Sequence, residues 1–159
     1  MTENNDSAIR TLMRAEGVRV ARRAIAEGNV NELDKSKRSP LFYVVMHGEP
    51  GLVTELIARG ANPNIRDVNG ETPLHFAARE YRPEEATLLL AHAAIVDMQD
   101  EHGNTPLWRA VFNSRNRGEV IALLLAAGAD KKLKNRHGVS PEELANTIAS
   151  HNAAQFLQG

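Results

Sequence analysis

Two histidines of this chain have the residue type and spacing that a metal site would need. His102 and His137 each stand three residues before a hydroxyl residue that is followed by proline, so they occupy equivalent positions in neighbouring copies of a repeat. Imidazole is a common metal ligand, and two equivalent histidines invite a zinc-site interpretation. However, helices of neighbouring copies in a stack lie about 8–10 Å apart, whereas every zinc ligand sits about 2 Å from the ion. We therefore predict no metal site.

Motifs of catalytic and cofactor-binding sites are missing from the sequence. It contains no G-x-x-x-x-G-K-[ST] phosphate loop, G-x-G-x-x-G turn, G-x-S-x-G nucleophile elbow or H-E-x-x-H metal helix. It also has no cysteine, which excludes disulfides, thiolate zinc sites and cysteine nucleophiles. We expect no enzyme activity and no cofactor. The alternative is a cryptic enzyme or metal protein, whose turnover or bound metal would be lost on changing His102 or His137.

A repeated hydroxyl-proline pair defines the elements that position these residues. The pair occurs as Ser39-Pro40, Thr72-Pro73, Thr105-Pro106 and Ser140-Pro141. The prolines are separated by 33, 33 and 35 residues (73 − 40, 106 − 73 and 141 − 106), which indicates a structural repeat. A hydroxyl side chain can cap a helix that begins with proline, so each pair predicts the start of a short inner helix. Apolar residues three and four apart, followed by Gly60 and Gly128, predict a second helix in each copy.

The two ends of the chain match the repeat less closely and are interpreted as caps. Ser7 predicts the N-cap of a helix over 8–13, followed by a second helix that ends before Gly28. At the other end, Ser140-Pro141-Glu142-Glu143 predicts a capping box. We therefore predict a single domain over residues 1–159, with units at approximately 5–33 (N-terminal cap), 34–66, 67–99, 100–134 and 135–159 (C-terminal cap).

Two local departures from the repeat affect these predictions. Ala93 stands where Gly60 and Gly128 stand in other units, so either that helix ends differently or an alanine adopts φ > 0. The third hydroxyl-proline interval is two residues longer than the others, and the alignment places the extra residues within 113–118. Because loops often carry function, we expect this segment to distinguish the protein from a generic stack.

Residues 67–78 closely resemble the D-x-x-G-x-T-P-L-H-x-A-A signature of the ankyrin repeat family. Asp67, Gly70, the run Thr72-Pro73-Leu74-His75 and the pair Ala77-Ala78 carry this resemblance. It implies an all-α ankyrin-repeat solenoid of about five helix-turn-helix units joined by β-hairpin fingers. It also implies that His75 is a structural hydrogen-bonding group and that the side chain of Trp108 packs between units.

The resemblance further implies a surface for another protein, formed by the finger tips and the exposed side of the inner helices. The positions carried over to this chain are Lys35, Arg38, Met46, His47, Arg66, Val68, Asn69, Glu71, Arg79, Glu80, Tyr81, Glu101, His102, Asn104, Phe112, Asn113, Arg115, Arg136 and His137. Met46, Tyr81 and Phe112 are expected to form an apolar and aromatic strip with charges around it, as protein interfaces commonly do.

Composition and charge are consistent with a protein partner. The 159 residues are 42% hydrophobic and 25% charged, and 19 basic against 20 acidic residues give a formal charge of −1. No overall positive field attracts nucleic acid or anionic lipid, and no run of eighteen apolar residues predicts a membrane span. We expect a cytoplasmic protein, monomeric when free, that inhibits or scaffolds its partner. The alternatives are an immunity protein that neutralises a cognate toxin and a homodimer formed through the apolar strip.

Overall fold

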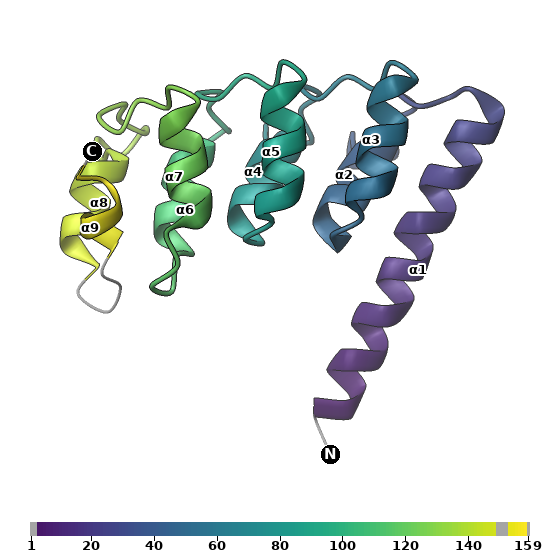
Figure 1. Cartoon of the computed structure of the whole chain (residues 1–159), viewed down its shortest axis with the longest axis horizontal. Coiled ribbons are helices and arrows are strands. Elements are labelled where there is room, and N and C mark those ends of the chain that lie inside the picture. The colour runs from purple at the N-terminus through teal and green to yellow at the C-terminus, as the bar shows by residue number, and fades with distance from the viewer. Residues whose placement is uncertain (1–2, 149–152, 159) are drawn as a thin grey trace.

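The computed structural model describes the backbone of residues 3–148 and 153–158, and the side chains of residues 15–148 and 153–158. These ranges contain α1 (Glu3–Glu27), α2 (Pro40–His47), α3 (Pro50–Ala58), α4 (Pro73–Arg79), α5 (Pro83–Ala91), α6 (Pro106–Phe112), α7 (Glu119–Ala126), α8 (Pro141–Thr147) and α9 (Ala153–Phe156). Helices α2 to α9 form pairs that stand side by side in one row, with α1 at the end of the row (Figure 1). The predicted all-α stack is therefore present.

The connections between the pairs are turns instead of β-hairpins. No β-strand occurs in the described residues. Each finger, as we call the segments 34–38, 67–71, 100–104 and 135–139, closes with a backbone hydrogen bond between its first and last residues. In the second finger the Asp67 amide donates to the Glu71 carbonyl at 2.9 Å.

The first unit is a single helix, so the prediction of two helices there is wrong. α1 runs without interruption for 25 residues, and Ser7 lies inside it. The one glycine in its path, Gly17, does not end the helix; it is buried, and a Cβ there would lie 2.7 Å from Cδ2 of His47. This glycine lets α1 approach α2 closely, and that packing offsets its low helix propensity, which costs about 1 kcal/mol. The described chain thus has one helix followed by four helix pairs, instead of five helix-turn-helix units.

The hydroxyl-proline pairs begin the inner helices, as the sequence predicts. The residue before each proline has an extended backbone, with φ between −84° and −99°, and the proline takes the first helical position. The Thr105 hydroxyl accepts a hydrogen bond from the Trp108 amide at 3.2 Å. At α8 the capping box is confirmed. Ser140 Oγ accepts a hydrogen bond from the Glu143 amide, and the Glu143 carboxylate accepts one from the Ser140 amide at 2.9 Å.

A residue with a left-handed backbone conformation follows each of the outer helices α3, α5 and α7, and Ala93 is one of these residues. Gly60 and Gly128 have φ of 86° and 91°, and Ala93 has φ of 63°. Of the two possibilities left open by the sequence, the strained alanine is therefore the one found. The turn is held by Asn64, whose Nδ2 donates to the Ala93 carbonyl at 2.9 Å and whose Oδ1 accepts from the Ile95 amide at 2.8 Å. These two hydrogen bonds hold the turn in this shape, so Ala93 keeps its positive φ despite the steric cost.

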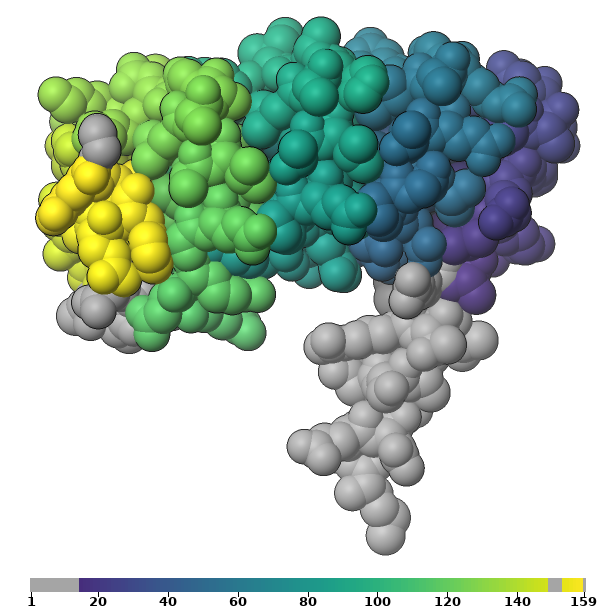
Figure 2. Space-filling model, viewed as in Figure 1, coloured from purple at the N-terminus to yellow at the C-terminus, as the bar shows by residue number. Residues whose placement is uncertain are grey.

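A continuous apolar core joins the pairs. Leu74 and Leu107 from the inner helices and Leu56, Leu89 and Leu124 from the outer helices have no exposed surface. Burying each leucine stabilises the fold by about 1.5–3 kcal/mol. Figure 2 shows that side chains fill the spaces between the helix pairs, so the row presents one continuous surface.

Candidate functional site

The fingers are built around a carboxylate or amide that binds the backbone of its own turn. Asp67 Oδ1 accepts hydrogen bonds from the Asn69 amide at 2.8 Å and the Glu71 amide at 3.0 Å. Asp34, Asp100 and Asn135 make the same pair of bonds in the other three fingers. Each finger therefore has its own fixed shape before any partner arrives.

Backbone hydrogen bonds join each finger to the next. The Glu101 amide donates to the Asn69 carbonyl at 3.0 Å, and the Arg136 amide donates to the His102 carbonyl at 2.9 Å. Gly103 (φ +76°) makes this approach possible, since a Cβ there would lie 2.8 Å from the Arg136 nitrogen. The four fingers, which together we call the finger row, consequently form one connected surface.

Arginine and carboxylate side chains alternate where the fingers meet the inner helices. Arg79 contacts Glu71 at 3.0 Å, and Arg109 bridges Glu71 at 3.1 Å and Asp100 at 2.6 Å. Burial favours the neutral form of Asp100, but the amide of Asn104 and the guanidinium of Arg109 outweigh it and lower the pKa of that carboxyl. Asp100 is therefore ionised, and its charge is neutralised by Arg109 within the protein.

Most of the residues predicted to meet a partner lie at the surface, although the structure does not test their binding. The exposed ones are Lys35, Arg66, Val68, Asn69, Glu80, Glu101, His102, Phe112, Arg115, Arg136 and His137. The half-buried ones are Arg38, Met46, His47, Arg79 and Asn113. Three others are buried: Glu71, Tyr81 and Asn104.

The expectation that Glu71 and Asn104 are exposed to a partner is wrong. Glu71 is 3% exposed because Arg79 and Arg109 cover its carboxylate. Asn104 is 6% exposed; its Oδ1 accepts from Nδ2 of Asn135 at 2.8 Å in the next finger. Both side chains hold neighbouring units together.

Tyr81 does not belong to an exposed apolar strip, so that prediction also needs correction. It is 8% exposed, has φ of 57°, and the guanidinium of Arg117 lies 3.9 Å from its ring centroid. Arg117 comes from the 113–118 segment between α6 and α7, which therefore covers Tyr81. Of the three predicted strip residues only Phe112 is largely exposed, at 51%.

Phe112 forms an aromatic platform with Trp108. The two rings are stacked, with centroids 5.3 Å apart and planes 13° from parallel. Trp108 is half-buried and packs against the core, which supports the structural interpretation of its motif position. The sequence predicts an exposed Phe112 but not this pairing, although the i, i+4 spacing of the two residues on one helix was a usable signal.

His75 has the structural role that the ankyrin resemblance implies. It is fully buried; Nδ1 lies 3.1 Å from the Thr72 amide nitrogen, and Nε2 lies 3.1 Å from the Asn104 carbonyl oxygen in the next finger. An amide can only donate, so Nδ1 accepts and Nε2 carries the proton. His75 thus ties the start of α4 to the neighbouring unit.

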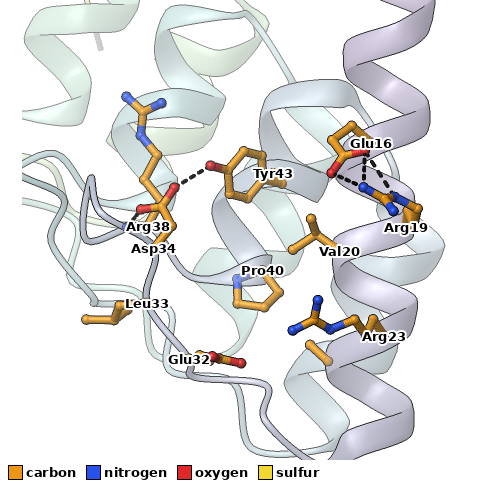
Figure 3. A pocket seen from close by; sticks show the side chains of 11 residues that line it. Glu16, Arg19, Val20, Arg23, Glu32, Leu33, Asp34, Arg38, Pro40 and Tyr43 are labelled. Atoms are coloured by element: carbon orange, nitrogen blue, oxygen red, sulfur yellow. Dashed lines mark hydrogen bonds and ion pairs between the residues drawn. The ribbon is translucent and has the colours of Figure 1, made fainter.

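A hollow of about 290 Å³ lies between α1, α2 and the first finger (Figure 3). Four of its ionisable groups are paired: Arg19 contacts Glu16 at 2.7 Å, and the Tyr43 hydroxyl donates to Asp34 Oδ2 at 2.5 Å. Burial, helped by Asp34, raises the pKa of Tyr43 to about 12, so the hydroxyl remains protonated near neutral pH. The pair therefore anchors the finger to α2 and is unsuited to acid-base chemistry. The repeat pattern did not predict this hollow, because one of its walls is the uninterrupted α1.

The described residues offer no arrangement suited to metal binding. No group of three or more His, Cys, Asp or Glu side chains among them could hold an ion. Within the same residues, no helix is both long enough and apolar enough to cross a bilayer.

Comparison with known families identifies the repeat. A family model described as ankyrin repeats (3 copies) matches residues 41–135, more than half of the chain. No curated protein matches the sequence.

Proposed function

Because this chain belongs to the ankyrin repeat family, whose repeats generally mediate protein-protein interaction, we propose that it binds a folded partner protein through its finger row and inner helices. The proposed role is non-catalytic. The finger row supplies a wide contact surface, and Phe112 at the end of α6 supplies an exposed aromatic side chain beside it.

The observation that carries the proposal is the platform of Phe112 on Trp108. Phe112 is 51% exposed, yet its ring is held by a stacked, half-buried indole. Aromatic side chains that are rigid and already partly packed are typical of interface hot spots, since they lose little freedom on binding.

The rigidity of the finger row supports the same proposal. Each finger is fixed by a side chain that binds its own backbone, and the fingers are joined to one another by amide-to-carbonyl bonds. A surface ordered in advance pays a smaller entropic cost on association. It therefore suits tight binding of another folded protein.

We further propose that binding inhibits or scaffolds the partner. Neutralisation of a cognate toxin by an immunity protein is one concrete form of this proposal. It predicts a single dominant partner whose own activity falls when this chain is added.

The test is capture of partners from native lysate on the immobilised full chain, followed by mass spectrometry and measurement of Kd. We expect Phe112→Ala to raise Kd at least about tenfold, because hot-spot truncations cost about 2 kcal/mol or more. Ile95→Ala is the matched control, because Ile95 is 52% exposed but lies between α5 and the third finger. Circular dichroism should show both variants folded. Equal weakening by the two variants, or no loss with Phe112→Ala, would contradict the proposal.

A further inference from the structure

Charge is divided unequally between the two sides of the stack. The outer helices α3, α5 and α7 contain the carboxylates Glu55, Glu84, Glu85 and Glu119 and no lysine or arginine. The fingers and the residues just before them expose Lys35, Lys37, Arg66, Lys134 and Arg136. Although the whole chain has a formal charge of −1, its finger row is locally cationic.

The carboxylates of the fingers do not cancel these cations. Asp67, Glu71 and Asp100 are at most 4% exposed and are paired with arginines. Two acids in the fingers are exposed, Asp34 and Glu101, against the five exposed cations named above, so the exposed charge of the finger row is positive.

A hollow of about 310 Å³ lies where this positive charge is concentrated, between the last two fingers. It is lined by Arg66, Gln99, Asp100, Gly103, Lys134, Asn135 and Arg136. Asp100 is already bonded to Arg109 at 2.6 Å. The Asp100 carboxylate is therefore paired with Arg109 and does not neutralise the cations that line the hollow.

None of the three cations is fully neutralised by the residues around it. Arg66 donates to the carbonyls of Gly70 at 3.2 Å and Gln99 at 3.0 Å, which position the guanidinium but carry no net charge. Lys134 contacts Glu143 at 3.0 Å, but both side chains are at least half exposed, so this pair contributes little. Arg136 makes no side-chain ion pair within the described residues.

We propose that the hollow and the finger row around it bind a carboxylate-rich segment of the partner protein. This inference rests on the proposed function and specifies the chemistry of the partner. Carboxylates would pair with Arg66 and Arg136, whose guanidinium groups can bind both oxygens of one carboxylate. The exposed carboxylates Glu84 and Glu119 of the outer helices would repel such a segment and favour its binding at the finger row.

A protein carboxylate fits this surface better than a nucleic acid does. The fingers and their preceding residues, 34–38, 66–71, 99–104 and 134–139, contain no Phe, Tyr or Trp. Single-stranded nucleic acids are usually bound by aromatic platforms placed along a basic groove, and here the groove lacks them.

The test is an NMR titration of the ¹⁵N-labelled full chain with a hexaglutamate peptide, with hexaglutamine and hexauridylate as comparisons. We expect hexaglutamate to shift the amides of residues 66–70, 99–103 and 134–138, and hexaglutamine to leave them unchanged. Raising the salt concentration should weaken the shifts. Arg136→Glu should raise the Kd for hexaglutamate about fivefold to tenfold, because it replaces an attraction by a repulsion. The matched control Arg22→Glu changes an exposed arginine on α1 and should leave Kd unchanged.

Several results would overturn this inference while leaving the proposed function intact. Shifts that are absent, that fall elsewhere on the molecule, or that persist unchanged in Arg136→Glu would refute the acidic-segment site. Tighter binding of hexauridylate to the same amides would indicate a nucleic-acid site instead. Partner capture that depends on Phe112 but not on Arg136 would show a protein-binding surface that recognises something other than carboxylates.

Discussion

Acidification should destabilise this protein through His75. Nδ1 accepts the Thr72 amide at 3.1 Å, and Nε2 donates to the Asn104 carbonyl at 3.1 Å, so the buried ring is neutral. A second proton on Nδ1 would remove the acceptor of the Thr72 amide, although the Thr72 hydroxyl oxygen, 2.9 Å from Nδ1, could accept that proton's hydrogen bond. Burial is the main cause that lowers the pKa of His75, from 6.5 to about 4, and the bond to the Asn104 carbonyl only partly opposes it.

The sign and size of the effect follow from that shift. The unfolded chain takes up a proton on His75 near pH 6.5, but the folded protein does not until about pH 4. The free energy of unfolding therefore falls as the pH drops from 6.5 to 4. At about 1.4 kcal/mol for each pKa unit, the loss reaches about 3 kcal/mol. That is a large share of the roughly 5–15 kcal/mol that stabilises a typical domain.

Urea unfolding at a series of pH values between 7 and 4 measures this loss. His75→Gln is the informative variant, because glutamine does not titrate and can cap the helix as Glu143 does at α8. The variant should be less stable than the parent at pH 7 but should lose about 2–3 kcal/mol less on acidification. His137→Gln, at an exposed histidine, serves as the control and should follow the parent. An NMR-measured pKa of His75 near 6.5, or parallel pH curves for parent and His75→Gln, would refute the reasoning.

Two backbone predictions concern left-handed residues. Ala93→Gly should stabilise the protein by about 0.5–1 kcal/mol and raise Tm by about 1–4 °C, because it relieves a positive φ; a fall in Tm would show that the alanine is unstrained. Gly103→Ala and Gly138→Ala introduce the same methyl group at φ of +76°, but only at Gly103 would that Cβ lie 2.8 Å from the backbone of the next finger. We therefore expect Gly103→Ala to cost at least about 1 kcal/mol more in urea unfolding, and equal losses would indicate that the fingers are not tightly joined.

The sequence alone predicted the features that depend on neighbouring residues. A hydroxyl residue before proline favours the start of a helix, so the starts of α2, α4, α6 and α8 could be predicted from the sequence, although the Ser39 hydroxyl makes no capping bond at α2. The capping box at Ser140 was predictable for the same reason. Repetition at a nearly constant interval then required these helices to stack, since one copy cannot bury its apolar face alone.

The length of α1 and the positive φ of Ala93 could not be predicted from neighbouring residues. A glycine inside a helical pattern usually weakens a helix, but Gly17 is tolerated because it lies against His47 of α2. Ala93 keeps a positive φ because Asn64, from the preceding unit, bonds to its carbonyl. In both cases the deciding contact comes from a residue about 30 positions away.

Which residues remain on the surface was decided only by the tertiary structure. Tyr81 and Glu71 occupy motif positions that are expected to be exposed, yet Arg117 covers one and Arg79 and Arg109 cover the other. The sequence determined the repeat and its local caps, because those depend on hydrogen bonds between near neighbours. The structure decided the exposure and pairing of charges, because long side chains reach across units to partners that sequence order does not reveal.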